Sequence, residues 1–262
     1  MKDFIKPVRT EKPRERGITH VLDKGLGPRA AEDLIETAKG YIDILKLGWG
    51  TGLVTGNLEK KIELYHQAGI NVCFGGTFFE YAYIKNKLDD YEAWMRDLGI
   101  NTVEVSNGTI EMEIKEKLRL IERFSKNFTV LSEVGSKDTS VVVAPYKWVE
   151  EIKATIKAGV YKIVTEGRES GTVGVFRKSG EIREGLIDEI MQDLDYTNFI
   201  FEAPNKPQQV WFIKKFGPEV NLGNIASSEV ISVETLRLGL RGDTFLTFHG
   251  QIEETKKEAY AH

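Results

Sequence analysis

A glycine that recurs about every thirty residues constrains the fold of this chain more than any other feature. Gly40, Gly69 and Gly99 are 29 and 30 residues apart, and Gly159 follows after 60. Each of them, like Gly217, ends a helix-like segment and is followed by a short apolar run. Glycine commonly ends helices because it tolerates the left-handed conformation. The chain is therefore predicted to repeat a helix, a glycine turn and a strand.

The apolar runs predict eight strands. They are short and rich in Val, Ile, Leu and Phe, which is typical of parallel strands buried on both faces. In the one empty slot of the glycine repeat, Asn127 is predicted to adopt the same left-handed cap. The strands are expected near residues 18–23, 42–47, 70–75, 101–105, 128–133, 160–165, 198–202 and 220–224. Eight βα units of ~30 residues match a closed (β/α)8 TIM barrel.

The main alternative is an open, doubly wound sheet that binds a dinucleotide. Residues 25–30 formally match the pattern G-x-G-x-x-A after a strand. That interpretation needs an acidic residue at the end of the second strand to bind a ribose. Residues 45–48 read Leu-Lys-Leu-Gly and contain no carboxylate. Pro28 is better interpreted as the first residue of a helix.

The domain organisation is predicted to be simple. We expect an N-terminal extension at residues 1–16, a single barrel domain at 17–249 and a polar C-terminal tail at 250–262. The longest irregular stretch, residues 167–185, contains five glycines and follows the sixth strand. Long loops in compact domains are often functional, so this stretch is interpreted as an insert or a mobile lid.

Composition excludes several classes of function. With 36 basic and 40 acidic residues the net charge is −4, which does not favour nucleic-acid binding. The single cysteine, Cys73, excludes an intrachain disulfide and a cysteine-based zinc or iron–sulfur site within one chain. No apolar run approaches ~18 residues and no secretory signal is recognised, so a cytoplasmic protein without membrane contact is expected. Outer helices of barrels often mediate association, which leaves a homo-oligomer open.

Charged residues follow the predicted strands where function gathers in barrels of this kind. The carboxylates at these positions are Asp23, Glu104, Glu133, Glu166 and Glu202. The cations are Lys24, Lys46, Lys137 and Arg168. Converging carboxylates suit Mg²⁺, and the cations suit an anionic substrate such as a phosphorylated acid. Turns rich in glycine or serine after strands six and eight offer backbone amides to phosphate.

Other residue types carry weaker indications. His20 and Cys73 are interpreted as interior packing residues rather than ligands, and no histidine cluster indicates zinc. The strand-end serines have no evident histidine partner, which argues against a serine hydrolase. Lys46 lies within an apolar strand, so a Schiff-base lysine remains an alternative.

The strand-end motifs, read together, resemble one family. The segments LDKGLGP, ILKLGWGT, GGTFFE, EVSNGT, SEVGSKD, EGRESG, FEAPN and LGNI resemble phosphosulfolactate synthase, the first enzyme of one route to coenzyme M. The resemblance extends from Gly17 to Phe248 and includes bacterial relatives and plant heat-stress-associated proteins. It implies a (β/α)8 barrel and a lyase that adds sulfite to phosphoenolpyruvate with Mg²⁺, through an enediolate, to give (2R)-2-O-phospho-3-sulfolactate.

On this basis we assign roles to the strand-end residues. Lys137 is the expected general acid, with Lys46 as the second candidate. Glu104, Glu133 and Glu202 are the expected metal ligands, and Asp23 is a candidate outer-shell partner. The candidates for binding phosphate or sulfonate are Lys24, Arg168, Ser170, Asn224 and Ser227. Two alternatives remain: a Schiff-base aldolase acting on a phosphorylated carbonyl compound, and a non-catalytic stress-associated relative on the same barrel.

Overall fold

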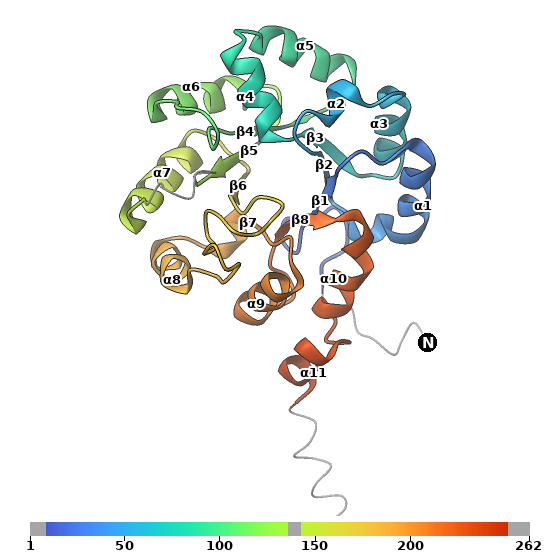
Figure 1. Cartoon of the computed structure of the whole chain (residues 1–262), viewed down its shortest axis with the longest axis vertical. Helices are drawn as coiled ribbons and strands as arrows, with labels where there is room; N and C mark the ends of the chain where they lie inside the picture. The colour runs from blue at the N-terminus through green and yellow to red at the C-terminus, as the bar shows by residue number, and fades with distance from the viewer. Residues whose placement is uncertain (1–8, 136–142, 251–262) are drawn as a thin grey trace, which may run out of the picture.

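Eight parallel strands surrounded by helices form a (β/α)8 barrel, as the sequence predicts (Figure 1). The computed structural model describes residues 9–135 and 143–250. The observed strands begin one or two residues later than predicted. They are β1 (Thr19–Asp23), β2 (Ile44–Leu47), β3 (Asn71–Phe74), β4 (Thr102–Val105), β5 (Thr129–Val134), β6 (Lys162–Thr165), β7 (Phe199–Glu202) and β8 (Leu222–Ala226).

The strand order closes the sheet on itself. The order is β3-β2-β1-β8-β7-β6-β5-β4, so the first and last strands of the sequence are paired in parallel. The two ends of this order, β3 and β4, also contact each other. There the backbone N–H of Gly76 donates a hydrogen bond of 2.7 Å to Oε1 of Glu104, which links the two strand ends through a side chain.

Helices follow each strand and pack around the barrel. The principal helices are α1 (Pro28–Ala38), α2 (Thr51–Val54), α3 (Leu58–Gln67), α4 (Gly76–Ile84), α5 (Leu88–Asp97), α6 (Ile114–Phe124), α7 (Pro145–Lys157), α8 (Glu184–Asp193), α9 (Lys206–Phe216), α10 (Val230–Arg237) and α11 (Gly242–His249). Short 3₁₀ turns are η2 (Lys39–Tyr41), η3 (Tyr196–Asn198) and η4 (Ser227–Glu229). Pro28 starts α1, as its fixed φ angle predicts.

Four of the five recurring glycines adopt the left-handed conformation that the sequence predicts. Gly69, Gly99, Gly159 and Gly217 have positive φ values of 67°, 68°, 101° and 87° at the helix-to-strand turns. Two predictions of a left-handed cap were wrong. Gly40 lies within the 3₁₀ turn η2. Asn127 has no positive φ. In the turn after α6, the backbone N–H groups of Asn127 and Phe128 both donate to the carbonyl of Phe124.

The core has two parts. A large apolar layer fills the space between the sheet and the helices. A smaller cluster fills the amino-terminal half of the barrel interior, and its buried members are Ile18, Ile44, Cys73, Leu131, Val164 and Ile200. Parallel strands buried on both faces account for both layers. We call the smaller cluster the apolar floor, because it lies beneath the polar residues at the carboxyl ends of the strands.

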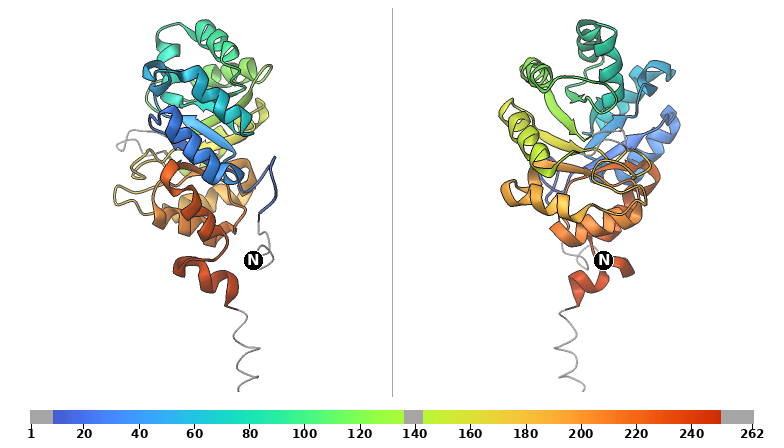
Figure 2. Two further views of the ribbon diagram at one scale, coloured as in Figure 1. Left: turned by 90° about the vertical axis from the view of Figure 1, so that its right-hand side faces the viewer. Right: turned by 60° about the vertical axis from the view of Figure 1, so that its left-hand side comes forward.

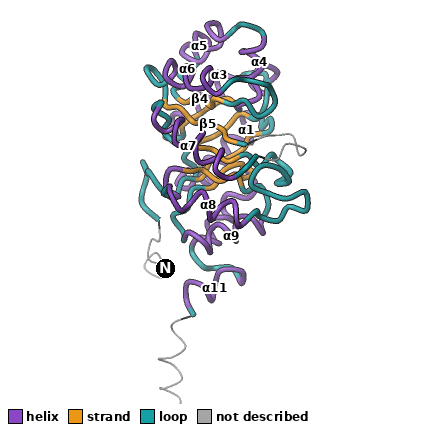
Figure 3. Tube along the Cα trace, turned by 90° about the vertical axis from the view of Figure 1, so that its left-hand side faces the viewer, coloured by secondary structure: helices purple, strands orange, loops and turns teal. Residues whose placement is uncertain are grey.

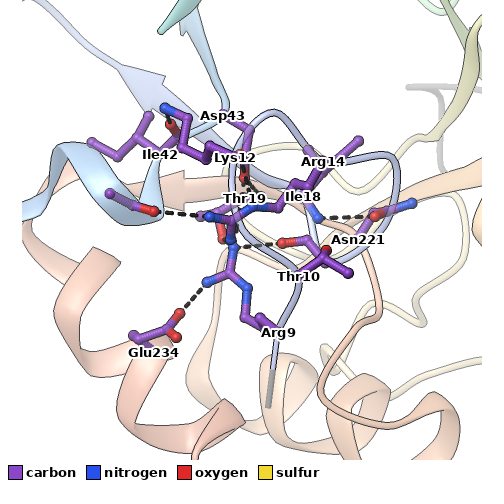
Figure 4. A network of polar contacts seen from close by, with 12 residues as sticks. Arg9, Thr10, Lys12, Arg14, Ile18, Thr19, Ile42, Asp43, Asn221 and Glu234 are labelled. Carbon is purple, nitrogen blue, oxygen red and sulfur yellow. Dashed lines mark hydrogen bonds and ion pairs between the residues drawn. The ribbon is translucent and has the colours of Figure 1, made fainter. Parts of the chain in front are cut away.

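The N-terminal segment from residue 9 lies against the chain just before β1 and β2, which its side chains contact (Figure 4). Arg9 is buried, pairs with Glu234 and donates to the carbonyl of Gly17 at 2.5 Å. Lys12 donates to the carbonyl of Ile42 at 2.5 Å. This segment and the loops after β6 lie at opposite ends of the barrel (Figures 2 and 3). The proposed division between residues 16 and 17 stays a prediction.

The last described helix, α11, projects from the body of the barrel (Figure 1). Its N-terminal turn still contacts the fold, because the hydroxyl of Thr244 donates to the carbonyl of Leu236 at 2.8 Å. Across residues 9–135 and 143–250, no helix is both long enough and apolar enough to cross a membrane.

Candidate active site

The polar layer of the barrel follows from the two-residue period of its strands. Side chains two residues apart point to the same side of a strand. Four of the six residues of the apolar floor are therefore followed, two positions later, by a charged residue whose side chain lines the barrel mouth. The pairs are Ile44 and Lys46, Leu131 and Glu133, Val164 and Glu166, and Ile200 and Glu202.

These side chains line a pocket of about 610 Å³ at the carboxyl ends of the strands. It is lined by Leu22, Lys46, Trp49, Gly75, Gly76, Thr77, Glu104, Thr109, Glu133, Glu166, Arg168, Glu169, Ser170, Glu202 and Asn224. The pocket therefore gathers seven of the predicted site residues: Lys46, Glu104, Glu133, Glu202, Arg168, Ser170 and Asn224. It is large enough for two small anions side by side.

Lys46 lies buried between two carboxylates. Its Nζ is 2.9 Å from Glu202 Oε1 and 3.4 Å from Glu104 Oε2. Burial alone would lower the pKa of Lys46, but Glu104, Glu202 and Glu133 together raise that pKa well above its ordinary value. Lys46 is thus an ammonium ion at neutral pH.

Glu104 is fully buried in the pocket wall, and this burial affects its pKa. Burial, with a smaller contribution from the charges of Glu133 and Glu202, raises the pKa of Glu104 to about 7 against the opposing effect of Lys46. The glycine at position 76 is required for its hydrogen bond. A Cβ atom there would lie 2.5 Å from Ser106 Cβ and 2.9 Å from Glu104 Oε1.

Glu80 is a site residue that the sequence interpretation did not assign. It lies on α4 and is 2% exposed, and its Oε1 is 2.5 Å from the hydroxyl of Ser106. The same hydroxyl is 2.9 Å from Glu133 Oε1. Ser106 therefore connects a helix carboxylate to a pocket carboxylate. The only sequence signal for Glu80 was its place in the GGTFFE motif, since helix residues do not follow the strand-end rule.

Two polar groups on the strand 6 and strand 8 side of the pocket are placed for a ligand. Asn224 is 6% exposed and has a positive φ of 52°. Its Oδ1 is buried without a hydrogen-bond partner among the described residues. Arg168 also has a positive φ, 54°, and its backbone N–H donates to Glu166 Oε1 at 2.6 Å. Glu166 itself lines the pocket, although it was not among the predicted metal ligands.

Two of the predicted anion-binding residues lie outside the pocket lining. Lys24 is half-exposed at the rim, where its Nζ is 2.5 Å from Glu169 Oε1. This contact joins the loop after β1 to the loop after β6. Ser227 begins the 3₁₀ turn η4 after β8 and does not line the pocket. Lys137, the predicted general acid, lies outside the described residues.

Asp23 faces away from the barrel interior. Its carboxylate is 2.7 Å from the ammonium of the fully buried Lys61 on α3 and also accepts from the hydroxyl of Tyr65 at 3.2 Å. It accepts the backbone N–H groups of Gly25 and Leu26 at 2.8 Å each. The structure therefore does not bring Asp23 to the predicted metal ligands. The physical reason is strand alternation: Leu22 lines the pocket, so its neighbour points to the helices.

A second set of potential ligands shares Glu104 with the pocket carboxylates. One ligand atom each from His20, Cys73 and Glu104 lie within 4.8 Å of one another, and all three residues are buried. Burial, with a contribution from Lys46, holds the pKa of His20 well below its usual range, and burial raises the pKa of the Cys73 thiol. This is a buried candidate metal site; the sequence interpretation treated His20 and Cys73 as packing residues and predicted only Glu104 as a metal ligand. Its nitrogen and sulfur donors suit a softer ion than Mg²⁺.

The stretch interpreted as an insert or lid packs onto the barrel. Residues Val173, Val175 and Phe176 are buried, and Phe176 forms a β-bridge with Ile182. Gly174 has a φ of 61°, and a Cβ there would lie 1.9 Å from the carbonyl oxygen of Glu166. The loop is therefore fitted closely to the end of β6.

The fold and the pocket together define a class of protein: a (β/α)8-barrel enzyme whose mouth combines buried carboxylates with cations for small anionic substrates. The family model described as (2R)-phospho-3-sulfolactate synthase (ComA) matches residues 7–243. The chain belongs to this family, so the resemblance seen in the strand-end motifs is confirmed and the protein is an enzyme of the lyase type.

Two individual relatives carry the name of this family, and a plant protein with another name is more distantly similar. Phosphosulfolactate synthase of Bacillus subtilis is 46% identical over 242 residues, which cover 91% of this chain and 96% of the relative. The enzyme of the same name from Methanothermobacter thermautotrophicus is 44% identical over 248 residues, covering 92% and 96%. Protein HEAT-STRESS-ASSOCIATED 32 of Arabidopsis thaliana is 25% identical, covering 87% and 88%.

Solved structures support the fold alone. The 3-hexulose-6-phosphate synthase of Salmonella typhimurium superposes with a TM-score of 0.54 at 11% identity, covering 84% of this chain and 98% of that one. At this identity the match confirms the barrel and carries no information about substrate.

Proposed function

We propose that the pocket catalyses addition of sulfite to phosphoenolpyruvate with Mg²⁺, giving (2R)-2-O-phospho-3-sulfolactate. The observation that carries this proposal is the convergence of Glu104, Glu133 and Glu202 with Lys46 and Arg168 in one pocket. Two relatives that are 44% and 46% identical, over 92% and 91% of the chain, carry the name phosphosulfolactate synthase. Two anionic reactants need a cationic mouth that holds them together, because proximity replaces a slow bimolecular encounter.

The residues present fit Mg²⁺. Glu104, Glu133 and Glu202 offer oxygen atoms only, which is the donor chemistry this ion prefers. Glu104 Oε2 is buried and accepts no hydrogen bond from the residues that the structure describes, although Lys46 lies 3.4 Å away. These three glutamates would hold the ion, and when bound it would neutralise the negative charge that builds on the substrate carboxylate. Because Asp23 is paired with Lys61 elsewhere, we leave it out of this ligand set.

The remaining polar groups would bind the anions. Arg168, Ser170 and Asn224 line the pocket from the ends of β6 and β8. The side-chain amide of Asn224 has a donor and an acceptor, and its NH₂ group would donate a hydrogen bond to an anionic oxygen of the substrate. Lys24 and Ser227 lie at the rim and would contact a ligand that extends outwards.

The reaction needs one proton delivered to the carbon that bears the phosphate. Sulfite brings its own lone pair, so no side-chain nucleophile is required. Lys46 is a poor proton donor because its carboxylate neighbours raise its pKa, which leaves Lys137 as our candidate for the general acid. The same effect opposes the aldolase alternative, since a Schiff base forms only from the neutral amine of a lysine.

The proposal is tested by incubating the protein with phosphoenolpyruvate and sulfite and following products by phosphorus NMR. A phosphosulfolactate signal that requires Mg²⁺ and disappears with chelator is expected. Glu133→Gln should lower metal affinity and turnover, whereas Glu189→Gln, at an exposed position on α8, should leave both unchanged. Unconsumed phosphoenolpyruvate under all conditions, or borohydride trapping of Lys46 with a carbonyl substrate, would refute the proposal.

We further propose that the protein acts in a reducing, cytoplasmic environment. Its single cysteine is free and buried, so no disulfide contributes to the fold. A homo-oligomer also stays a prediction, and analytical ultracentrifugation of the full chain would test it.

A further inference from the structure

The short segment that carries Arg168 and Ser170 is held at both ends. At its start, the backbone N–H of Gly167 donates to Glu202 Oε2 at 2.8 Å. Arg168 N donates to Glu166 Oε1 at 2.6 Å. Both acceptors lie at the ends of barrel strands, so the first two residues of the loop are fixed to the rigid part of the fold.

The other end is fixed by the first turn of α9. Gln208 is 1% exposed, and its Nε2 donates to the carbonyls of Gly171 and Gly180 at 2.8 and 3.0 Å. Its Oε1 accepts the backbone N–H of Asn205 at 3.2 Å. Asn205 Nδ2 in turn donates to the carbonyl of Ser170 at 2.9 Å. One buried amide thus ties two distant points of the loop to a helix.

A side chain at position 171 would displace the amide groups that fix the loop, and it would do so in a backbone conformation that L residues rarely adopt. Gly171 has a φ of 66°, and a Cβ there would lie 2.5 Å from Gln208 Nε2 and 2.6 Å from Asn205 Nδ2. A loop that merely rested against α9 would tolerate a side chain. The glycine and the buried amide therefore form a fitted pair, in which each depends on the other's shape.

We infer that Gln208 is a positioning residue for substrate binding: through Gly171 it fixes the backbone from which Arg168 and Ser170 reach the anionic group of the substrate. Gln208 does not line the pocket, so it acts through these residues and not on the reacting atoms. This inference rests on the proposed function, in which Arg168 and Ser170 bind phosphate or sulfonate. A misplaced cation loses much of a charge-assisted hydrogen bond, which depends on geometry.

The test replaces Gln208 by Leu, which keeps the volume and removes both donors. We expect KM for phosphoenolpyruvate to rise about tenfold, with a smaller change in kcat, as for loss of one hydrogen bond to a charged group. The matched control is Gln209→Leu. Gln209 is also buried in α9, but it donates to the carbonyl of Ala203 and to Glu229 and not to the loop. Gln209→Leu should lose stability without raising KM.

A double-mutant cycle separates positioning from a general loss of stability. If Gln208 acts through Arg168, then Gln208→Leu should change KM little in an Arg168→Ala background. Amide exchange over residues 168–182 should be faster in Gln208→Leu than in Gln209→Leu. Full additivity with Arg168→Ala, an unchanged KM, or equal exchange in the two variants would overturn the inference. Absence of turnover in the native protein would instead refute the proposed function, and the exchange comparison would still decide the role of Gln208 in the loop.

Discussion

Replacing Lys46 by Met should destabilise the barrel in a way that depends on pH. The ammonium lies 2.9 Å from Glu202 and 3.4 Å from Glu104, with all three side chains buried. At an effective dielectric constant of ~20, each contact corresponds to about 5 kcal/mol of Coulomb energy. The desolvation of three charges offsets much of that. Removing one partner of a buried pair nevertheless costs about 3–5 kcal/mol, because the remaining charge stays buried.

The pH dependence follows from Glu104. Its pKa of about 7 in the folded protein lies above the ordinary value of 4.5, so folding takes up a proton between these limits. The stabilising contribution of this group is complete below about pH 4.5 and is lost as pH rises through about 7. Since Lys46 lowers the pKa of Glu104, the variant should raise it further. Each added unit of pKa corresponds to about 1.4 kcal/mol of extra destabilisation at high pH.

Urea unfolding followed by circular dichroism, with chelator present, measures this effect. The loss of unfolding free energy in Lys46→Met should be larger at pH 8.5 than at pH 5.5, where Glu104 is largely protonated. Lys162→Met is the control, because Lys162 is also buried but donates to the carbonyl of Thr197 at 2.9 Å. An equal loss of unfolding free energy at both pH values, or a loss no greater than that of the control, would show that Lys46 does not stabilise the ionised form of Glu104.

Three further outcomes are expected. Lys137→Ala should lower kcat by about 10²–10⁴-fold while Mg²⁺ affinity, measured by calorimetry, is retained; near-normal turnover would remove Lys137 from the acid role. Gly174→Ala should lower the midpoint of thermal unfolding strongly, because its Cβ would meet the carbonyl of Glu166 at 1.9 Å in a left-handed conformation, and an unchanged midpoint would contradict that packing. Lys61→Met should cost about 3–5 kcal/mol of stability by leaving Asp23 buried and unpaired, yet leave Mg²⁺ affinity unchanged; weaker metal binding would return Asp23 to the metal site.

The sequence predicted the barrel and most of the pocket for the same physical reason. A strand has a period of two, and a parallel barrel collects strand ends at one face. That rule placed Lys46, Glu104, Glu133 and Glu202 correctly in one pocket.

The same rule failed where a single step along a strand decides direction. Asp23 follows Leu22 by one residue and therefore points to Lys61 on α3. Glu80 and Gln208 lie on helices, and only the folded structure shows that one contacts Ser106 and the other the carbonyl of Gly171. Such contacts depend on the distance between elements, which no local pattern records.

The layering of the barrel interior explains how a charged site and a stable fold coexist. Below the pocket, six buried residues form the apolar floor: Ile18, Ile44, Cys73, Leu131, Val164 and Ile200. The N-terminal segment binds the backbone just before β1 and β2. Water is thus excluded from one side of Lys46 and its carboxylates. Low local polarity strengthens their mutual attraction and also raises the pKa of Glu104. The other side of this charged cluster faces the pocket, where Lys46 and its carboxylates would contact a charged ligand directly. The apolar floor therefore contributes to the electrostatics of the site as well as to the stability of the barrel.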